Sequence, residues 1–109
     1  MDLDEYQKKA KESAIYPSLQ HPWVYPLLGL AGEAGEVADK LKKVLRDHDQ
    51  KLTPELLKAI EKELGDTLWY LAVLADELGL SLEQIAQVNL AKLVSRKDRG
   101  ALHGWGDER

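Results

Sequence analysis

The sequence predicts an all-α fold in a single domain, residues 1–109. Four stretches repeat apolar residues with the 3.6-residue period of a helix. No segment alternates apolar and polar residues as a half-buried strand does. Because a chain of 109 residues buries only a modest core, self-association would supplement it. We therefore expect a four-helix bundle that homo-oligomerisation completes.

The first two predicted helices flank a proline-rich segment. The first spans Leu3–Tyr16, because Pro17 disfavours a helix at the residue before it. The segment Pro17–Pro26 contains three prolines and predicts an ordered loop. The second helix is predicted over Leu27–Arg46, where apolar residues follow the helical period at Leu30, Ala34, Val37, Leu41, Val44 and Leu45.

A third helix is predicted after a polar break at residues 47–50. Thr53 and Pro54 have the pattern of an N-cap and a first-turn proline, and Gly79 is a typical C-terminal stop. One face of this helix predicts a core stripe of Leu57, Ile60, Leu64, Leu68, Leu71, Ala75 and Leu78.

The third helix is also apolar on almost every side between Leu68 and Ala75. Four helices of one small chain cannot easily cover such a segment, so we infer a subunit interface involving Trp69–Ala75. The alternative is an exposed aromatic patch.

Ser81 begins a segment that resembles a capping box, and a fourth helix is predicted from there to near Lys97. The tail, residues 100–109, contains three glycines, and we expect it to be flexible.

Composition excludes several classes of function. The net charge of −4 disfavours a nucleic-acid polymer as partner, because such binding depends on neutralising phosphates. No apolar run approaches the ~20 residues that cross a bilayer, and the acidic start Met1–Glu5 does not resemble a signal peptide. The lack of cysteine excludes disulfides and thiolate catalysis. These features fit a cytoplasmic protein without a membrane partner.

Two pairs of acids carry the strongest chemical signal. Glu33 and Glu36 lie three residues apart on the second predicted helix, and Glu63 and Asp66 do so on the third. That spacing places each pair on one face of its helix. Four gathered carboxylates repel one another unless a cation is present, and hard oxygen ligands suit Mg²⁺ or Mn²⁺. The alternative is two solvated acidic faces.

A glycine separates the acids of each pair. Gly35 and Gly65 are unusual in a helix interior, and we expect them to permit the close approach of a helix or a ligand.

The fourth helix places polar groups on its apolar face. Asn89 and Arg96 fall within the stripe of Leu82, Ile85, Ala86 and Leu93, and Lys92 lies at its edge. Phosphate oxygens would be suitable partners for them. The alternative is that the two cations pair with local acids.

A base-binding site is predicted less directly. Trp23 and Tyr25 could stack on a nucleobase, and the amide of Gln7 could bond to its edge. Alternatively, the two rings attach the proline-rich loop to the core.

Together these motifs resemble the MazG-like all-α nucleoside triphosphate pyrophosphohydrolase family. That family carries E-x-x-E, a spacer and then E-x-x-D, which Leu28–Glu36 and Glu63–Tyr70 match with 26 residues between Glu36 and Glu63. The segment Asn89–Arg96 resembles the family's N-x-x-K-L-x-x-R.

The resemblance implies Mg²⁺-dependent hydrolysis of nucleoside or deoxynucleoside triphosphates to the monophosphate and pyrophosphate, by a dimer or tetramer. Glu33, Glu36, Glu63 and Asp66 would bind metal, with Mn²⁺ as a substitute, and Glu36 would accept the proton of the attacking water. Lys92, Arg96 and Asn89 would bind phosphate. A pyrophosphatase specific for dUTP or phosphoribosyl-ATP, and a non-enzymatic helical dimerisation module, remain as alternatives.

Overall fold

The computed structural model describes residues 1–17, 20–47, 49 and 51–109. Its four helices are α1 (Leu3–Glu12), α2 (Val24–Asp47), α3 (Pro54–Glu77) and α4 (Leu82–Asp98), and the described residues include no strand. The all-α prediction is therefore confirmed. Among the described residues, no helix is long and apolar enough to cross a membrane.

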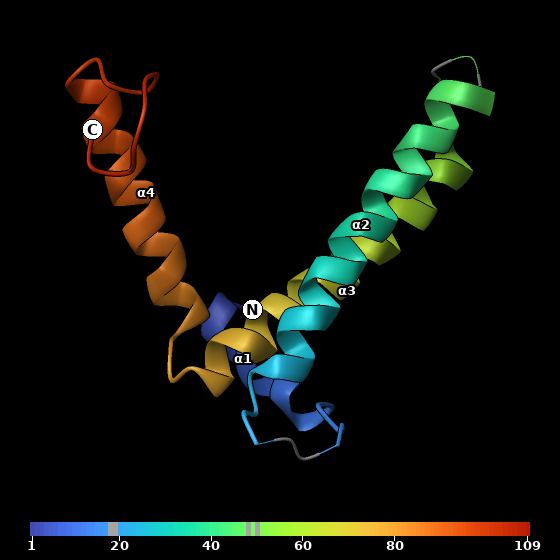
Figure 1. Ribbon diagram of the computed structural model, residues 1–109, viewed down its shortest axis with the longest axis horizontal. Coiled ribbons are helices and arrows are strands. Elements are labelled where there is room, and N and C mark those ends of the chain that lie inside the picture. Colours follow the sequence, from blue (N-terminus) through green and yellow to red (C-terminus); the bar gives the residue numbers. More distant parts are fainter. Residues whose placement is uncertain (18–19, 48, 50) are drawn as a thin grey trace.

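The helices form a V rather than a closed bundle (Figure 1). The antiparallel pair α2 and α3 makes one arm, α4 makes the other, and α1 lies across α3 at the vertex. Helix α4 meets α1 and α3 only near its start and does not pack against α2. The radius of gyration is 17.0 Å, compared with about 13 Å for a compact domain of this length.

The helix starts follow the predicted caps. The side chains of Asp2, Thr53 and Ser81 accept hydrogen bonds from the third backbone N–H beyond them. Gly79, with φ of 73°, follows the end of α3, as predicted.

Two boundaries differ from the prediction. Helix α1 ends at Glu12 rather than Tyr16, because the backbone N–H of Ser13 bonds to the carbonyl of Ala10, three residues back, and so closes the last turn. The Ser13 hydroxyl donates to the same carbonyl. Helix α2 begins at Val24, inside the predicted loop, since Pro26 fits the first turn, where no intrahelical N–H bond is needed. The predicted polar break begins within α2 at Asp47, and its residues 48 and 50 lie outside the described part of the chain.

The core lies at the vertex. Ala10 of α1, Ala72 and Val73 of α3 and Leu82 of α4 are buried together. Ala72 and Val73 are 0% exposed, so α1 and the start of α4 cover much of the segment that we had assigned to a subunit interface. Ala72, Val73 and Ala75 are thus core within one chain, which corrects that part of the prediction. Leu71 is 36% exposed, and the rest of the predicted interface stays a prediction.

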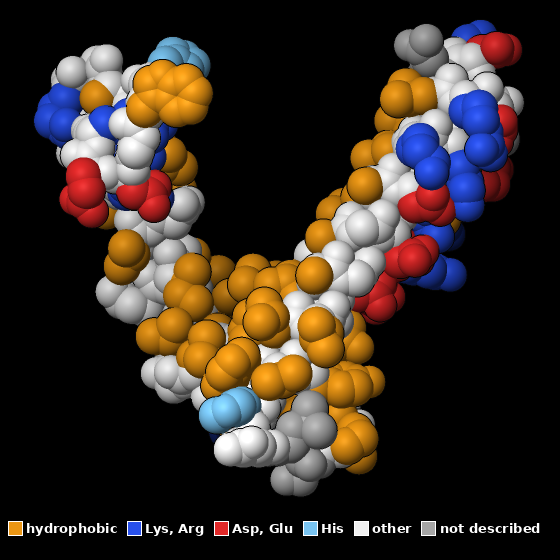
Figure 2. Space-filling view, in the orientation of Figure 1, with side chains coloured by type: hydrophobic (Ala, Val, Ile, Leu, Met, Phe, Trp, Pro, Cys, Tyr) orange, Lys and Arg blue, Asp and Glu red, His pale blue; other side chains and the backbone are white. Residues whose placement is uncertain are grey.

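Much of the predicted core stripe of α3 is exposed rather than buried. Ile60 and Ala75 are buried, but Leu57, Leu64 and Leu78 are each about half exposed. Leu68 and Leu71 are 37% and 36% exposed. Figure 2 shows hydrophobic side chains gathered over the floor of the V and along its inner edges. An apolar stripe of this length therefore lacks a cover within the chain.

Candidate metal centre

Helices α2 and α3 bring the predicted acids together. The two helices pack along their length, so the E-x-x-E face of α2 meets the E-x-x-D face of α3. One carboxylate oxygen each from Glu33, Glu63 and Asp66 lies within 4.8 Å of the other two. Glu33 and Glu63 are partly buried, whereas Asp66 is exposed. We call these three residues the acid cluster.

Glu36, the fourth predicted ligand, lies outside this cluster. Its side chain is exposed, and its negative charge acts on both Glu33 and Lys40. The structure therefore brings together three of the four acids and leaves the fourth at the border, one helical turn from Glu33.

Lys40 neutralises part of the cluster. Its ammonium nitrogen lies 3.1 Å from Oε1 of Glu63. This contact, followed by a hydrogen bond with Glu33, lowers the pKa of Glu63. The pKa of Glu33 is raised, first by that shared hydrogen bond and then by partial burial and the charge of Asp66. A hydrogen bond between two carboxyl groups needs a proton on one of them, and the raised pKa of Glu33 favours that residue as its carrier.

The donor set of the cluster fits a hard divalent cation. All three groups are carboxylates, and among the described residues no sulfur or imidazole takes part in the cluster. Oxygen-only ligands suit Mg²⁺ or Mn²⁺ better than zinc or copper. The two glycines beside the acids leave space, since a Cβ at Gly35 or Gly65 would meet no atom within 4 Å. The close approach expected at these glycines is therefore not made within one chain.

The predicted phosphate-binding residues are not assembled with the cluster. Asn89, Lys92 and Arg96 lie on α4, which extends away from α2 (Figure 1). The tail contacts the two cations instead: Oδ1 of Asp107 lies 3.6 Å from both the Lys92 ammonium and the Arg96 guanidinium. Arg96 is only 4% exposed and also donates to the backbone carbonyl of Asp107. Within one chain, Lys92 and Arg96 therefore pair with a nearby acid, Asp107, as the alternative interpretation of these cations predicted.

The tail is folded against α4. Arg109 donates to the carbonyls of Ala101, Leu102 and Gly106, and Arg99 donates to the carbonyl of Arg109. The expected flexibility of the tail stays a prediction.

Gln7 has a structural role rather than the predicted base-binding role. It is 7% exposed, and its amide nitrogen donates to the carbonyls of Ala72 and Leu80. Its amide oxygen accepts from the N–H of Leu82. The side chain thus joins α1, α3 and α4, and we remove it from the base site.

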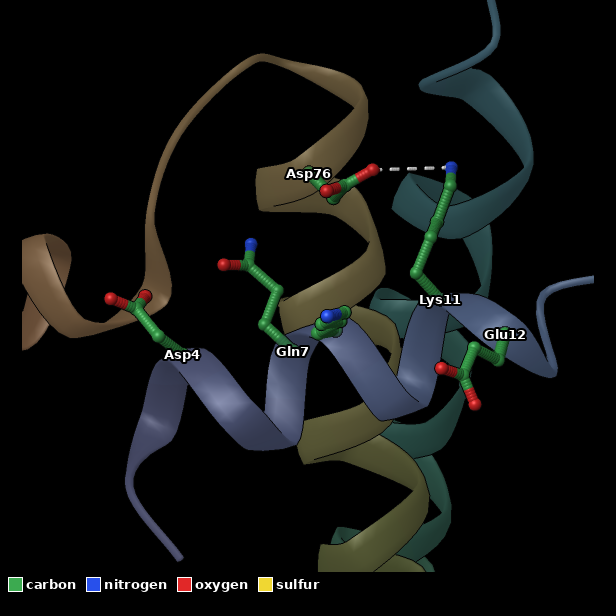
Figure 3. Close-up of a pocket in the computed structure, with 6 residues that line it drawn as sticks. Asp4, Gln7, Lys11, Glu12 and Asp76 are labelled. Carbon is green, nitrogen blue, oxygen red and sulfur yellow. Dashed lines mark ion pairs between the residues drawn. The ribbon is translucent and has the colours of Figure 1, made fainter.

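Gln7 also borders a polar pocket of about 390 Å³ between α1 and the end of α3 (Figure 3). Lys11 pairs there with Asp76 at 3.4 Å, and the pocket is also lined by Asp4, Lys8 and Glu12. None of the predicted metal ligands lines this pocket.

An aromatic row leads toward the acid cluster. Tyr25 stacks on Tyr16 with ring centroids 4.9 Å apart and meets Tyr70 at 6.5 Å. Burial raises the pKa of Tyr70, and the neighbouring Tyr25 hydroxyl and the negative charges of Glu33 and Asp66 raise it further. Trp23 stacks on His21 at 5.2 Å, within the segment before α2. Tyr25 is 40% exposed and therefore accessible to a ligand.

Lys40 and Tyr70 were missed as site residues, although their spacing signals both. Lys40 follows Glu36 by four residues, and Tyr70 follows Asp66 by four, so each shares the face of its acid.

Comparisons with known proteins identify the family of the chain. A family model described as the MazG nucleotide pyrophosphohydrolase domain matches residues 26–100. The chain is 46% identical, over 114 aligned residues, to the "Gene 37 protein" of Mycobacterium phage L5, and the match covers 100% of both proteins. That name states no activity. No solved structure matches the chain. The family match includes the acid cluster, Glu36 and the α4 cations, and it ends before Ala101.

Proposed function

Because the chain belongs to the MazG nucleotide pyrophosphohydrolase family, we propose that it hydrolyses nucleoside or deoxynucleoside triphosphates to the monophosphate and pyrophosphate. The reaction depends on Mg²⁺, for which Mn²⁺ can substitute. The observation that carries this proposal is the acid cluster of Glu33, Glu63 and Asp66, which gathers three carboxylates from two helices inside the family match. The enzyme would meet these substrates in the cytoplasm.

The acid cluster would hold the metal, with Glu36 at its border. A divalent ion bound there supplies Lewis acidity toward the phosphate oxygens and toward the attacking water. Glu36 is the group best suited to accept the proton of that water, because it is exposed and adjoins the cluster without being part of it. Attack at the α-phosphorus then releases pyrophosphate.

Asn89, Lys92 and Arg96 would bind the departing phosphates in an oligomer. Within one chain α4 does not reach α2. A second copy seated in the V could bring its α4 to the acid cluster and also cover the exposed stripe of Leu57, Leu64 and Leu78. Phosphate oxygens would have to displace Asp107 from Lys92 and Arg96, which the 86% exposure of the Asp107 side chain permits. We therefore propose a homo-oligomer, a dimer or a tetramer.

The nucleobase would stack on the aromatic side of the site. Tyr25 is partly exposed and its ring contacts that of Tyr70. Tyr70 lies near the acid cluster, because the charges of Glu33 and Asp66 raise its pKa. Trp23, one residue before α2, is a second candidate for stacking. Stacking on such rings tolerates several bases.

A direct test is product analysis with a panel of ribo- and deoxynucleoside triphosphates, including dUTP, in the presence of Mg²⁺. We expect equimolar monophosphate and pyrophosphate, and no turnover in excess EDTA. Release of orthophosphate and a nucleoside diphosphate, or full activity in EDTA, would refute the proposal. Turnover of dUTP alone would support the narrower specificity, and no turnover of any nucleotide would favour a dimerisation module.

A further inference from the structure

We propose that Lys40 is a built-in counter-cation of the acid cluster: it occupies Glu63 in the metal-free protein and is displaced from that carboxylate when a divalent cation binds. This inference rests on the proposed function, because it assumes that the cluster is a metal centre.

The first support is the direction in which Lys40 points. It pairs across the helix interface with Glu63 of α3, at 3.1 Å. Its two neighbours behave differently: Lys42 and Lys43 both pair with Asp39 on their own helix, at 3.1 and 2.8 Å. A lysine ordinarily extends into solvent and forms such local pairs. Lys40 is directed instead at a carboxylate of the cluster.

The second support is that the contact is partly shielded from water. The Lys40 and Glu63 side chains are 33% and 19% exposed, compared with 52% and 37% for Lys43 and Asp39. The cluster crowds three carboxylates within 4.8 Å, so an ammonium group at its border reduces their repulsion. Lys40 thus helps an otherwise self-repelling site to assemble before metal arrives.

The third step concerns competition. A metal ion that coordinates Glu63 neutralises the negative charge that holds the Lys40 ammonium group. The two cations therefore compete for one carboxylate. Once displaced, the ammonium group remains at the border of the site, where a phosphate oxygen is its natural partner. Lys40 would then act on the substrate from the same helix as Glu33 and Glu36.

A purely structural role for Lys40 makes a different prediction. If the pair only ties α2 to α3, its removal lowers stability and leaves metal affinity unchanged. If Lys40 competes with metal, its removal destabilises the metal-free protein and also tightens metal binding. The two roles are separated by measuring both quantities.

The experiment uses the full chain without nucleotide. Lys40→Met keeps the alkyl length and removes the charge, and Lys43→Met is the matched control, because it removes a charge on the same helix whose partner is Asp39. Isothermal titration with Mn²⁺ at low salt should show about threefold tighter binding, or more, for Lys40→Met. Lys43→Met should stay within about twofold of wild type. Thermal melts in EDTA should show a lower Tm for Lys40→Met than for Lys43→Met.

Unchanged or weaker Mn²⁺ binding by Lys40→Met would overturn the inference and leave the proposed function standing. Absence of Mn²⁺ binding by wild type would instead refute the metal centre, and the inference with it. If Lys40→Met does not fold, Lys40→Arg tests the same point: its retained charge should keep the affinity at or below that of wild type, and tighter binding would contradict the counter-cation role.

Discussion

The two glutamates of the E-x-x-E motif have different surroundings, although they are one helical turn apart. Glu33 is partly buried and shares a hydrogen bond with Glu63, which raises its pKa. Glu36 is exposed and lies outside the three-acid cluster. From this difference we propose different tasks at the residue scale: Glu33 as a metal ligand, and Glu36 as the group that accepts a proton.

Glu36→Gln should therefore lower kcat by at least about tenfold while preserving most of the Mn²⁺ affinity. Glu63→Gln should lose both, because Glu63 belongs to the cluster. Steady-state kinetics and metal titration measure the two effects. Glu61→Gln, an exposed change on α3 outside the cluster, is the control and should behave as wild type. Equal loss of Mn²⁺ binding in Glu36→Gln and Glu63→Gln would instead show that Glu36 coordinates the metal as Glu63 does.

At the scale of elements, one glycine fixes how closely α2 meets α3. A Cβ at Gly29 would lie well inside contact distance of the Tyr70 ring. Tyr70 is itself held by Trp69, whose ring meets it edge-on at 5.0 Å. Gly32, three residues further along α2, faces open space. Close packing against Tyr70 therefore requires a glycine at position 29, whereas no contact within the chain requires one at position 32.

Gly29→Ala should destabilise the fold by about 1–3 kcal/mol, because the ring must move. Gly32→Ala should instead stabilise it by up to about 1 kcal/mol, the difference in helix propensity. Urea unfolding measures both. Combining Gly29→Ala with Tyr70→Ala should remove most of the steric penalty. If the two glycine variants change stability equally, the contact with Tyr70 does not control the packing of these helices.

A second link between elements joins the segment after α1 to the end of α3. The Tyr16 hydroxyl donates to Oε1 of Glu77 at 2.5 Å, and Lys11 pairs with the same carboxylate. Burial, followed by this hydrogen bond, raises the pKa of Tyr16 to about 12. The folded state therefore holds the phenolic proton more tightly than the unfolded chain, whose tyrosine titrates near pH ~10.

The sign of the pH effect follows from this difference. The stabilisation is fully present below pH ~10 and is lost as the pH rises toward about 12. Urea unfolding between pH 9 and 12, chosen as roughly this window, should show a steeper loss for wild type than for Tyr16→Phe. Glu77→Gln should give an intermediate slope, because burial of Tyr16 remains. Parallel curves for wild type and Tyr16→Phe would exclude this coupling.

The whole molecule has an open shape with an uncovered apolar interior. The stripe formed by Leu57, Leu64, Leu68, Leu71 and Leu78 runs along α3, and hydrophobic side chains also cover the floor of the V (Figure 2). Large contiguous apolar surface in a small protein indicates an interaction site. A second copy of this chain is a suitable partner, because it would present the same exposed apolar stripe and the two stripes could cover each other.

Light scattering at micromolar concentration should therefore report at least twice the 12.3 kDa of one chain. Leu71→Glu, a charge placed within the stripe, should shift the protein toward monomer and lower its activity. Leu102→Glu, at a similarly exposed site in the tail, should change neither. A wild-type monomer would contradict the proposed assembly, as would an unchanged mass for Leu71→Glu.

Local patterns in the sequence were sufficient for the elements and for the identity of the acids. Helical period, caps such as Thr53 and Ser81, and Gly79 after α3 are short-range signals, so they predicted all four helices. The i,i+3 spacing places two acids on one face of any helix, which predicted Glu33, Glu36, Glu63 and Asp66 as one group; the structure gathers all of them except Glu36. The family followed from the same motifs in order.

Only the tertiary structure decided what these faces meet. Periodicity shows that Leu57 and Leu64 share a face with Ile60, but not whether that face is covered, because the direction of α4 depends on the contacts at the vertex. Gln7 reads as an available amide until its three backbone partners, all more than 60 residues away in sequence, are known. Lys40 and Lys43 look alike in sequence, and the packing of α2 on α3 alone gives one of them a partner in the acid cluster. Spacing fixes which residues share a face of a helix, whereas long-range packing fixes what lies opposite that face.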